Sequence, residues 1–190
     1  MARRLVVLSD LWGSKKGLWI TSYLGYLQQY YDIVYYDSRQ LADMDLPPVH
    51  TAEDVYHAFA ETGMKRAAAR LLSKEQEPAD YLAFGGGGSI AWQAALMGLP
   101  VKSLYAVSPL CLQKIGGNPE CPVTLVYGEY HENRPAPLWF RQAGLEPEII
   151  SKFGQELYSD EKIIQKVCMD LLKEVIEDRS GKPKKQLSAY

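Results

Sequence analysis

Four consecutive glycines and a serine, residues 85–89, form the stretch whose residue types and spacing have the clearest chemical meaning in this sequence. An apolar run, residues 81–84, precedes them, and residues 90–97 follow with the apolar periodicity of a helix, so we predict a strand, a tight turn and a helix. Glycines in such a turn permit positive φ angles or a close approach of the backbone to another group. Two kinds of site use this arrangement: a phosphate cradle at a helix N-terminus, and a strained turn that holds a nucleophilic serine above a sheet.

The elements that must position this turn follow from the apolar pattern of the chain. Short runs of bulky apolar residues predict buried strands, and longer segments with apolar residues at helical spacing predict amphipathic helices. Strands that alternate with helices indicate a mostly parallel sheet covered on both faces. We therefore expect an α/β fold, a three-layer α/β/α sandwich with about six strands. The expected strands are 5–8, 32–36, 81–84, 101–107, 122–127 and 147–151; the expected helices are 16–30, 51–73 with a break at Gly63, 90–97, 137–143 and 160–177; and residues 41–49 are expected to be a loop.

The composition is that of an ordinary soluble domain. The chain has 190 residues, of which 47% are hydrophobic, and a net charge of -2, which suits one well-packed core and is short for two. We expect residues 1–177 to form a single domain and the polar residues 178–190 to be a disordered tail. The Lys and Arg residues are scattered until that tail, so we expect no nucleic acid as a partner.

The N-terminus and the cysteines bear on the cellular compartment. The first apolar run, residues 5–8, is far too short for a signal peptide or a membrane span, so we expect no association with a membrane. The three cysteines, Cys111, Cys121 and Cys168, are too few for a disulfide framework and show no metal-ligand spacing. The sequence therefore favours a cytoplasmic protein without a metal or another cofactor.

Residues 83–109 resemble the segment of the α/β-hydrolase superfamily that runs from a strand through the motif G-x-S-x-G-G and a helix to a second strand that ends in Ser-Pro. The resemblance covers nearly the whole chain and is to small esterase-like and dienelactone-hydrolase-like members without a lid domain. In the register that best matches the helix, Ala83 stands for the first glycine and Gly85 for the nucleophile. A register shifted by two residues puts Gly87 at the nucleophile position. A third register puts Ser89 there and shortens the helix, and Ser89 is also a candidate N-cap.

The resemblance implies positions for the other members of a Ser-His-Asp triad. The Asp position, after the strand 122–127, holds His131, with Glu129 and Glu132 as the nearest carboxylates, and the His position before the last helix holds Gln155. A Gln side chain does not accept and carry a proton near neutral pH, and a His is neutral or cationic where the triad needs an anion. All three triad positions are thus substituted, which predicts the loss of acyl transfer.

The resemblance also assigns a role to the loop after the first strand, which in the family supplies half of the oxyanion hole. By position the backbone N–H of Leu11 would take this role, and Trp12 follows it. Oxyanion stabilisation needs only N–H groups that point at the developing charge. Leu11, Trp12, Gly86, Gly87 and Gly88 are therefore the expected binding residues.

Three classes of function are open on this reading. The first is a non-catalytic binding module with a shallow pocket over residues 85–88, lined by Leu11, Trp12 and His131; its ligand would be a small molecule or a peptide, and a homodimer is compatible with the sequence. The second is an active hydrolase of small esters or thioesters that uses Ser89 with His131. The third is nucleotide or phosphate binding by the glycine turn, which fits a loose G-x-G-x-x-A pattern but lies in the middle of the chain.

Overall fold

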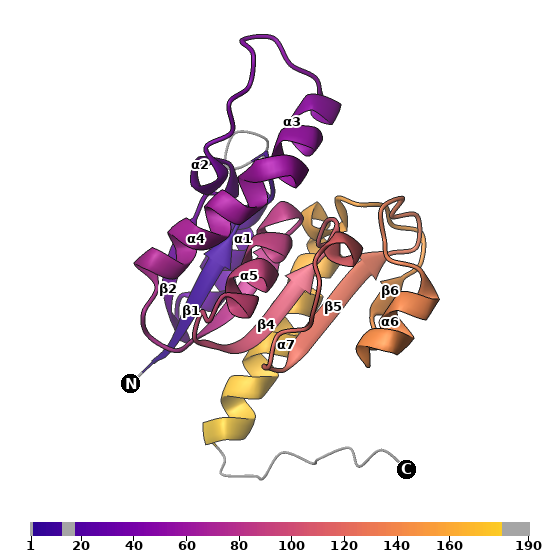
Figure 1. Ribbon diagram of the computed structural model, residues 1–190. Coiled ribbons are helices and arrows are strands. Elements are labelled where there is room, and N and C mark those ends of the chain that lie inside the picture. Colours follow the sequence, from indigo (N-terminus) through magenta and orange to yellow (C-terminus); the bar gives the residue numbers. More distant parts are fainter. Residues whose placement is uncertain (1, 13–17, 180–190) are drawn as a thin grey trace.

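The computed structural model describes residues 2–12 and 18–179, and its architecture is a three-layer sandwich (Figure 1). A six-stranded sheet with the order β2-β1-β3-β4-β5-β6 forms the middle layer, and all neighbouring strands are parallel. The expected α/β fold with a mostly parallel sheet of about six strands is confirmed. The strands are β1 (Arg3–Leu8), β2 (Tyr31–Tyr36), β3 (Ala79–Phe84), β4 (Val101–Val107), β5 (Val123–Gly128) and β6 (Glu148–Ile150).

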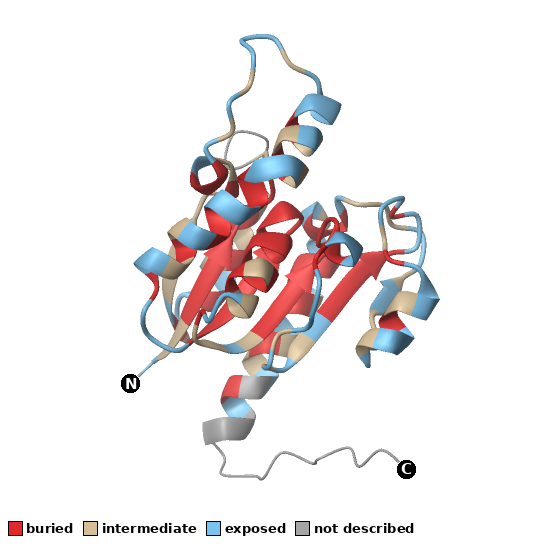
Figure 2. Ribbon diagram, viewed as in Figure 1, coloured by how far each residue is buried: buried red, intermediate tan, exposed pale blue. Residues whose placement is uncertain are grey.

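Helices cover both faces of this sheet, and each face has its own apolar core. The core on one face is closed by α1 (Trp19–Leu27) and α7 (Glu161–Arg179). The core on the other face is closed mainly by α4 (Met64–Lys74) and α5 (Gly86–Leu96). Buried residues are accordingly concentrated in the strands and on the helix surfaces that face them (Figure 2). The remaining helical segments are α2 (Ser38–Ala42), α3 (Ala52–Ala58), a π-helical turn (Phe59–Gly63), α6 (Pro137–Ala143) and two 3-10 turns (Leu112–Lys114 and Leu157–Ser159).

The sequence of β1 shows why the two cores form. Val6 and Leu8 belong to the core beneath α4 and α5, whereas Leu5 and Val7 belong to the core beneath α1 and α7. Successive side chains of a strand point to opposite faces, so a continuous apolar run fits only a strand that is covered on both sides. Since all six strands are parallel, their carboxyl ends meet at one edge of the sheet, where the glycine turn also lies.

Two buried carboxylates at the other end of the strands, near their amino ends, are paired with arginines. The Glu75 carboxylate accepts hydrogen bonds from the Arg4 guanidinium at 2.9 Å and from the Tyr36 hydroxyl at 2.7 Å. The Asp80 carboxylate accepts hydrogen bonds from the Arg3 guanidinium at 2.9 and 3.0 Å. These ion pairs fasten β1 to β3 and to the end of α4, and they satisfy two charges that would otherwise be costly to bury.

The ends of several elements differ from the predicted ones, most of all in α5, which begins at Gly86 and not at residue 90. The structure also departs from the predicted elements in two other places. Residues 41–42, expected to be loop, belong to α2, because the Asp37 carboxylate caps this helix by accepting from two backbone N–H groups of its first turn. The predicted break at Gly63 is also wrong. The π-helical turn Phe59–Gly63 joins α3 to α4 without interruption, and the Met44 side chain packs where a Cβ of Gly63 would stand, 3.0 Å from that position.

Two further features concern the ends of the chain. The helix α7 continues to Arg179, two residues past the expected domain boundary, and the predicted disorder of residues 180–190 lies outside the described residues. Within residues 2–12 and 18–179, no helix combines the length and the apolar character that crossing a membrane requires.

Candidate functional site

The turn between β3 and α5 is centred on Gly85. This residue has φ 52° and ψ -123°, a conformation that residues with a Cβ rarely adopt. Its N–H donates to the Val107 carbonyl at 2.9 Å, and its own carbonyl accepts from the Gly88 N–H at 3.1 Å, so the chain leaves the sheet and enters the helix within one residue. The helix α5 begins at Gly86, which makes Gly85 its N-cap.

The volume beside Gly85 is occupied by Asp10 and Tyr158. A Cβ at Gly85 would lie 3.2 Å from the Asp10 Cβ and 3.8 Å from the Tyr158 hydroxyl oxygen. The Asp10 carboxylate accepts hydrogen bonds from the Tyr158 hydroxyl at 2.9 Å and from the backbone N–H of Trp12 at 3.0 Å. Burial, and then the nearby Asp10 carboxylate, raise the pKa of the Tyr158 hydroxyl, so this group remains a hydrogen-bond donor.

The three glycines that follow are packed tightly. A Cβ at Gly86 would overlap the Leu11 side chain, one at Gly87 would overlap the Ser9 carbonyl, and one at Gly88 would lie 2.8 Å from Pro109. The glycine run therefore serves the close approach of α5 to the ends of β1 and β4.

A cavity of about 490 Å³ opens over the start of this turn. Its walls come from the segment after β1, from α3, and from the connections that follow β5 and β6. Leu11, Trp12, Gly85, Gly86 and Gln155 line this cavity, but Gly87, Gly88 and His131 do not, so the expected pocket over residues 85–88 is confined to its first two glycines. The remaining lining residues are Asp10, Ala52, Glu53, Val55, Tyr56, His57, Leu110, Glu132, Asn133 and Tyr158.

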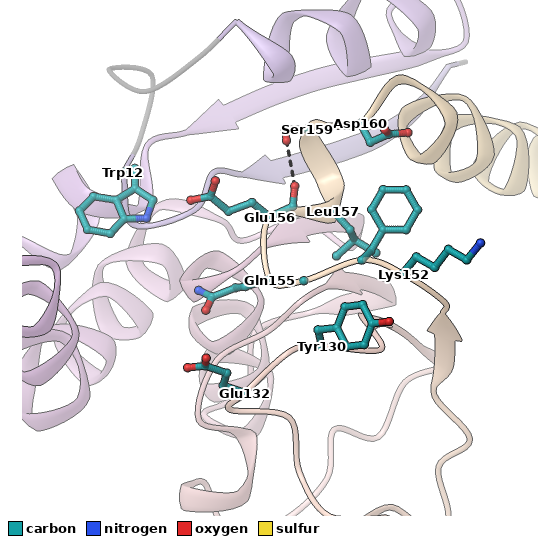
Figure 3. A pocket seen from close by; sticks show the side chains of 11 residues that line it. Trp12, Tyr130, Glu132, Lys152, Gln155, Glu156, Leu157, Ser159 and Asp160 are labelled. Atoms are coloured by element: carbon teal, nitrogen blue, oxygen red, sulfur yellow. Dashed lines mark hydrogen bonds between the residues drawn. The ribbon is translucent and has the colours of Figure 1, made fainter.

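A second hollow of about 780 Å³ adjoins the first and shares Trp12, Glu132 and Gln155 with it. In Figure 3, the side chains of Glu132, Gln155 and Glu156 extend toward the side on which Trp12 lies, whereas Lys152 points away from it. The two hollows together form an open cleft along the carboxyl ends of the strands, which is where ligands bind in open α/β sheets.

His131 lies behind the wall of the cavity, and its predicted role as a lining residue is wrong. Its ring packs edge-on against Tyr127, with the ring centroids 5.2 Å apart, and the residue is only 4% exposed. Among the described residues, neither ring nitrogen has a hydrogen-bond partner. Burial lowers the pKa of His131, and the Arg134 guanidinium adds to this effect, while the backbone of Ser108 opposes it. His131 is therefore held as a neutral ring.

Ser89 is also excluded from the cavity. Its hydroxyl donates to the Leu110 carbonyl and accepts from the Leu110 N–H at 3.0 Å, and the residue is fully buried. It is the fourth residue of α5 and not its N-cap, which is Gly85. Within the described part of the chain no hydrogen bond joins Ser89 to His131. The predicted Ser89–His131 pair is therefore wrong, because the serine hydroxyl is used to fasten α5 to the segment after β4.

The two carboxylates that the sequence placed near His131 have different surroundings. Glu132 lines both hollows, close to Gln155. The Glu129 carboxylate accepts a hydrogen bond from the Lys152 N–H at 2.9 Å and supports the turn after β6. The site thus collects Gly85, Glu132 and Gln155 from three strand ends.

Sequence reasoning missed the two residues closest to Gly85, namely Asp10 and Tyr158. Asp10 follows directly after a buried strand, and this position was a usable signal because the carboxyl ends of parallel strands converge. Tyr158 had no such signal, since it meets Asp10 across 148 positions of the chain. The residues of α3, including His57, were missed because their helical pattern does not say what the helix covers. No group of three metal-ligating side chains occurs among residues 2–12 and 18–179.

Comparisons with known proteins identify the fold of this chain. No protein-family model matches the sequence, and no curated protein matches it. Solved structures of α/β-hydrolase proteins do match. A provisionally assigned hydrolase of the alpha/beta superfamily from Xanthomonas campestris pv. campestris shares 15% identity, covers 90% of this chain and 99% of its own, and has a TM-score of 0.66.

Two further solved structures of hydrolases also match this chain. A predicted CIB-like hydrolase from Thermoplasma acidophilum shares 18% identity over 90% of this chain and 87% of its own, with a TM-score of 0.63. A dienelactone hydrolase-like promiscuous phosphotriesterase from metagenomic libraries shares 12% identity over 92% of this chain and 86% of its own, with a TM-score of 0.65. The chain therefore has the α/β-hydrolase fold, and a fold by itself does not assign an activity.

Proposed function

We propose that this protein keeps the scaffold of an α/β hydrolase, has lost serine acyl transfer, and binds a small molecule or a peptide in the cavity over Gly85 and Gly86. The observation that carries the proposal is the conformation of Gly85. This residue sits at the sharp strand-to-helix turn where hydrolases of this fold hold their nucleophile, with the positive φ of such an elbow and without a side chain.

The surroundings of the turn support the loss of catalysis. Gln155 lines the cavity where the fold places its general base, and an amide cannot take the proton of a nucleophile. His131 lies behind the cavity wall, where its ring cannot replace that base. Removing a complete triad costs about 10⁶-fold in kcat and leaves about 10³ to 10⁴ over water. Such a residual rate is too small to be the function of the protein.

The cavity itself supports a binding role. Its volume of about 490 Å³ is typical of small-molecule sites, which span roughly 300 to 1,000 Å³. Apolar side chains such as Leu11 and Val55 line it together with a few polar groups, among them Gln155 and Asn133. The phosphate-binding alternative is disfavoured, because the Asp10 carboxylate lies beside the start of α5 and repels an anion there.

The catalytic half of the proposal is tested with a fluorophosphonate probe and a panel of p-nitrophenyl esters and acyl thioesters. We expect neither labelling nor turnover above the rate of the buffer. Covalent labelling by the probe, or turnover above the rate of the buffer, would overturn the proposal.

The binding half is tested by screening a fragment library by ligand-observed NMR. Asn133 lines the cavity, so the larger side chain of the variant Asn133→Trp is expected to obstruct it and to weaken the binding of the hits. The matched control Gln28→Trp places the same side chain on the exposed end of α1, and it is expected to bind like the original protein. A screen without hits, or hits that survive Asn133→Trp, would contradict a ligand site in this cavity.

A further inference from the structure

The outer wall of the cavity is a short helix with few attachments to the rest of the protein. We call residues 51–58, which are α3 and its N-cap, the flap. Five of the residues that line the cavity belong to it: Ala52, Glu53, Val55, Tyr56 and His57. Most of the flap is exposed to solvent and stands at the end of the molecule beside the long connection from α2 (Figures 1 and 2). Segments with few buried contacts open locally at low cost.

The flap joins the body through the π-helical turn Phe59–Gly63. A π-helical turn holds one residue more than the α-helix it interrupts, so a shift between the two forms changes the direction of the helix on one side of it. Beyond the turn, α4 is fixed in the core by Ala67, Ala68 and Leu71, and the turn itself is anchored by the fully buried Phe59. The rigid side of this junction is therefore α4, and the side that is free to move is the flap.

One side-chain hydrogen bond joins the flap to the body. The Tyr56 hydroxyl and the Cys111 thiol form a hydrogen bond of 2.8 Å, and the Lys114 ammonium lies 5.7 Å from the centroid of the Tyr56 ring. In the part of the chain that the structure describes, every other hydrogen bond or ion pair of a flap side chain stays within the flap. Val55 adds an apolar contact with the core.

The position of Cys111 makes it a reporter of flap movement. The residue is only 1% exposed and faces a hollow formed by the π-helical turn, the start of α4 and the segment after β4. Cys111 lines this hollow and Tyr56 lines the ligand cavity, so the hydrogen bond between them joins the walls of the two. The thiol is almost fully buried and contacts the Tyr56 hydroxyl, so we expect its alkylation to speed up when Tyr56 moves away with the flap.

We propose that the flap gates the ligand cavity by swinging about the π-helical turn, and that the hydrogen bond between Tyr56 and Cys111 is the latch of its closed form. This inference rests on the proposed function, because the flap would control access to the cavity in which the ligand is proposed to bind. In this proposal the structure is the closed form, in which α3 forms one wall of the cavity that Gly85 and Gly86 also line. The flap differs from a lid domain inserted after β4, where this chain has only the segment 108–122 with one 3-10 turn.

The test measures the alkylation rate of each cysteine by mass spectrometry under native conditions, normalised to its rate in guanidinium chloride. A thiol is a weak hydrogen-bond donor, so loss of this bond shifts a local equilibrium about two- to fivefold, and the variant Tyr56→Phe is expected to label Cys111 faster by that factor. Cys168 lies on the buried side of α7, on the opposite face of the sheet, and reports global unfolding in the same sample. Its rate is expected to stay unchanged.

The matched control is Tyr26→Phe, which removes a tyrosine hydroxyl bonded to Glu161 on the far face and should leave the Cys111 rate as it was. Hydrogen exchange of a peptide that covers residues 52–58 is the second readout and should speed up in Tyr56→Phe, while a peptide from α5 should not. An unchanged Cys111 rate, or equal acceleration of Cys111 and Cys168, would overturn the latch. Neither readout needs a ligand, so a failed fragment screen with a fast Cys111 would refute the binding role and leave the moving flap in place.

Discussion

Replacing Gly85 tests whether the turn at the end of β3 requires glycine for its backbone. The φ of 52° and ψ of -123° lie outside the regions that residues with a Cβ populate, and such strain costs about 1 to 3 kcal/mol. A Cβ here would also stand 3.2 Å from the Asp10 Cβ, a contact that requires a small shift. In the opposite direction, an alanine lowers the conformational entropy of the unfolded chain, which stabilises the folded protein by about 0.4 to 1 kcal/mol. We expect Gly85→Ala to lower the free energy of unfolding by about 1 to 2 kcal/mol.

The assay is equilibrium unfolding in urea, with Gly25→Ala as the matched control. Gly25 lies within α1, and a Cβ at this position would meet nothing within 4 Å. The same substitution should therefore stabilise the protein by about 0.5 to 1 kcal/mol, because alanine is the better helix former. A Gly85→Ala variant that is as stable as the original protein would refute the reasoning, since it would mean that the turn is not strained.

A serine at position 85 tests whether a hydroxyl at this turn can act as a nucleophile. The variant Gly85→Ser restores a hydroxyl to the elbow, yet Gln155 offers no base and the space beside it already holds Asp10 and Tyr158. We expect neither fluorophosphonate labelling nor ester turnover from this variant. Labelling of the new serine would show that a base is within reach, and would then point to a residue other than Gln155.

Three further predictions concern buried polar groups. Burial lowers the pKa of His131, so as the pH falls below about 6.5 the unfolded chain takes up the proton first and the free energy of unfolding decreases. The decrease is at most about 1.4 kcal/mol per pH unit. The variant His131→Phe should remove this part of the pH dependence, as measured by urea unfolding at pH 7.5 and 5.5. Glu75→Gln should cost about 2 kcal/mol, because Arg4 keeps its charge without a carboxylate partner, and an unchanged urea midpoint would contradict this. Ser89→Ala should cost about 1 to 2 kcal/mol through the unpaired Leu110 backbone, whereas a fully stable variant would show that these hydrogen bonds are replaced.

The layers of the fold could be predicted from the sequence because burial on two faces leaves a local trace. Residues 5–8 of β1 and 81–84 of β3 are apolar at every position, and α7 carries apolar residues at helical spacing, so the local sequence of each element indicates how it is buried. The glycine turn was equally readable, since four adjacent glycines have few other uses. Its register was not, because Gly85, Gly87 and Ser89 all fit some version of the motif.

The composition of the site could be predicted only in part, because its contacts join distant parts of the chain. Gln155 and Gly85 were found through a resemblance that fixes the order of strand ends. The direction of the His131 ring depends on the packing of Tyr127, and no local pattern encodes it. The covering helix α3 reads as an ordinary amphipathic helix, and its apolar face does not reveal which surface it will cover.

The contact between Asp10 and Tyr158 makes it hard to build a nucleophile at this turn by a single substitution. A buried space left by a missing side chain costs free energy unless neighbours fill it. Here the Asp10 carboxylate stands beside Gly85 and is held by the Tyr158 hydroxyl, whose ring in turn packs against Trp19 with a centroid distance of 4.7 Å. The neighbours of Gly85 are thus fixed by the apolar core beneath α1 and α7. The effects of substitutions at Gly85, at Gln155 and at the Asp10–Tyr158 pair are therefore coupled, and their free energies will not add independently.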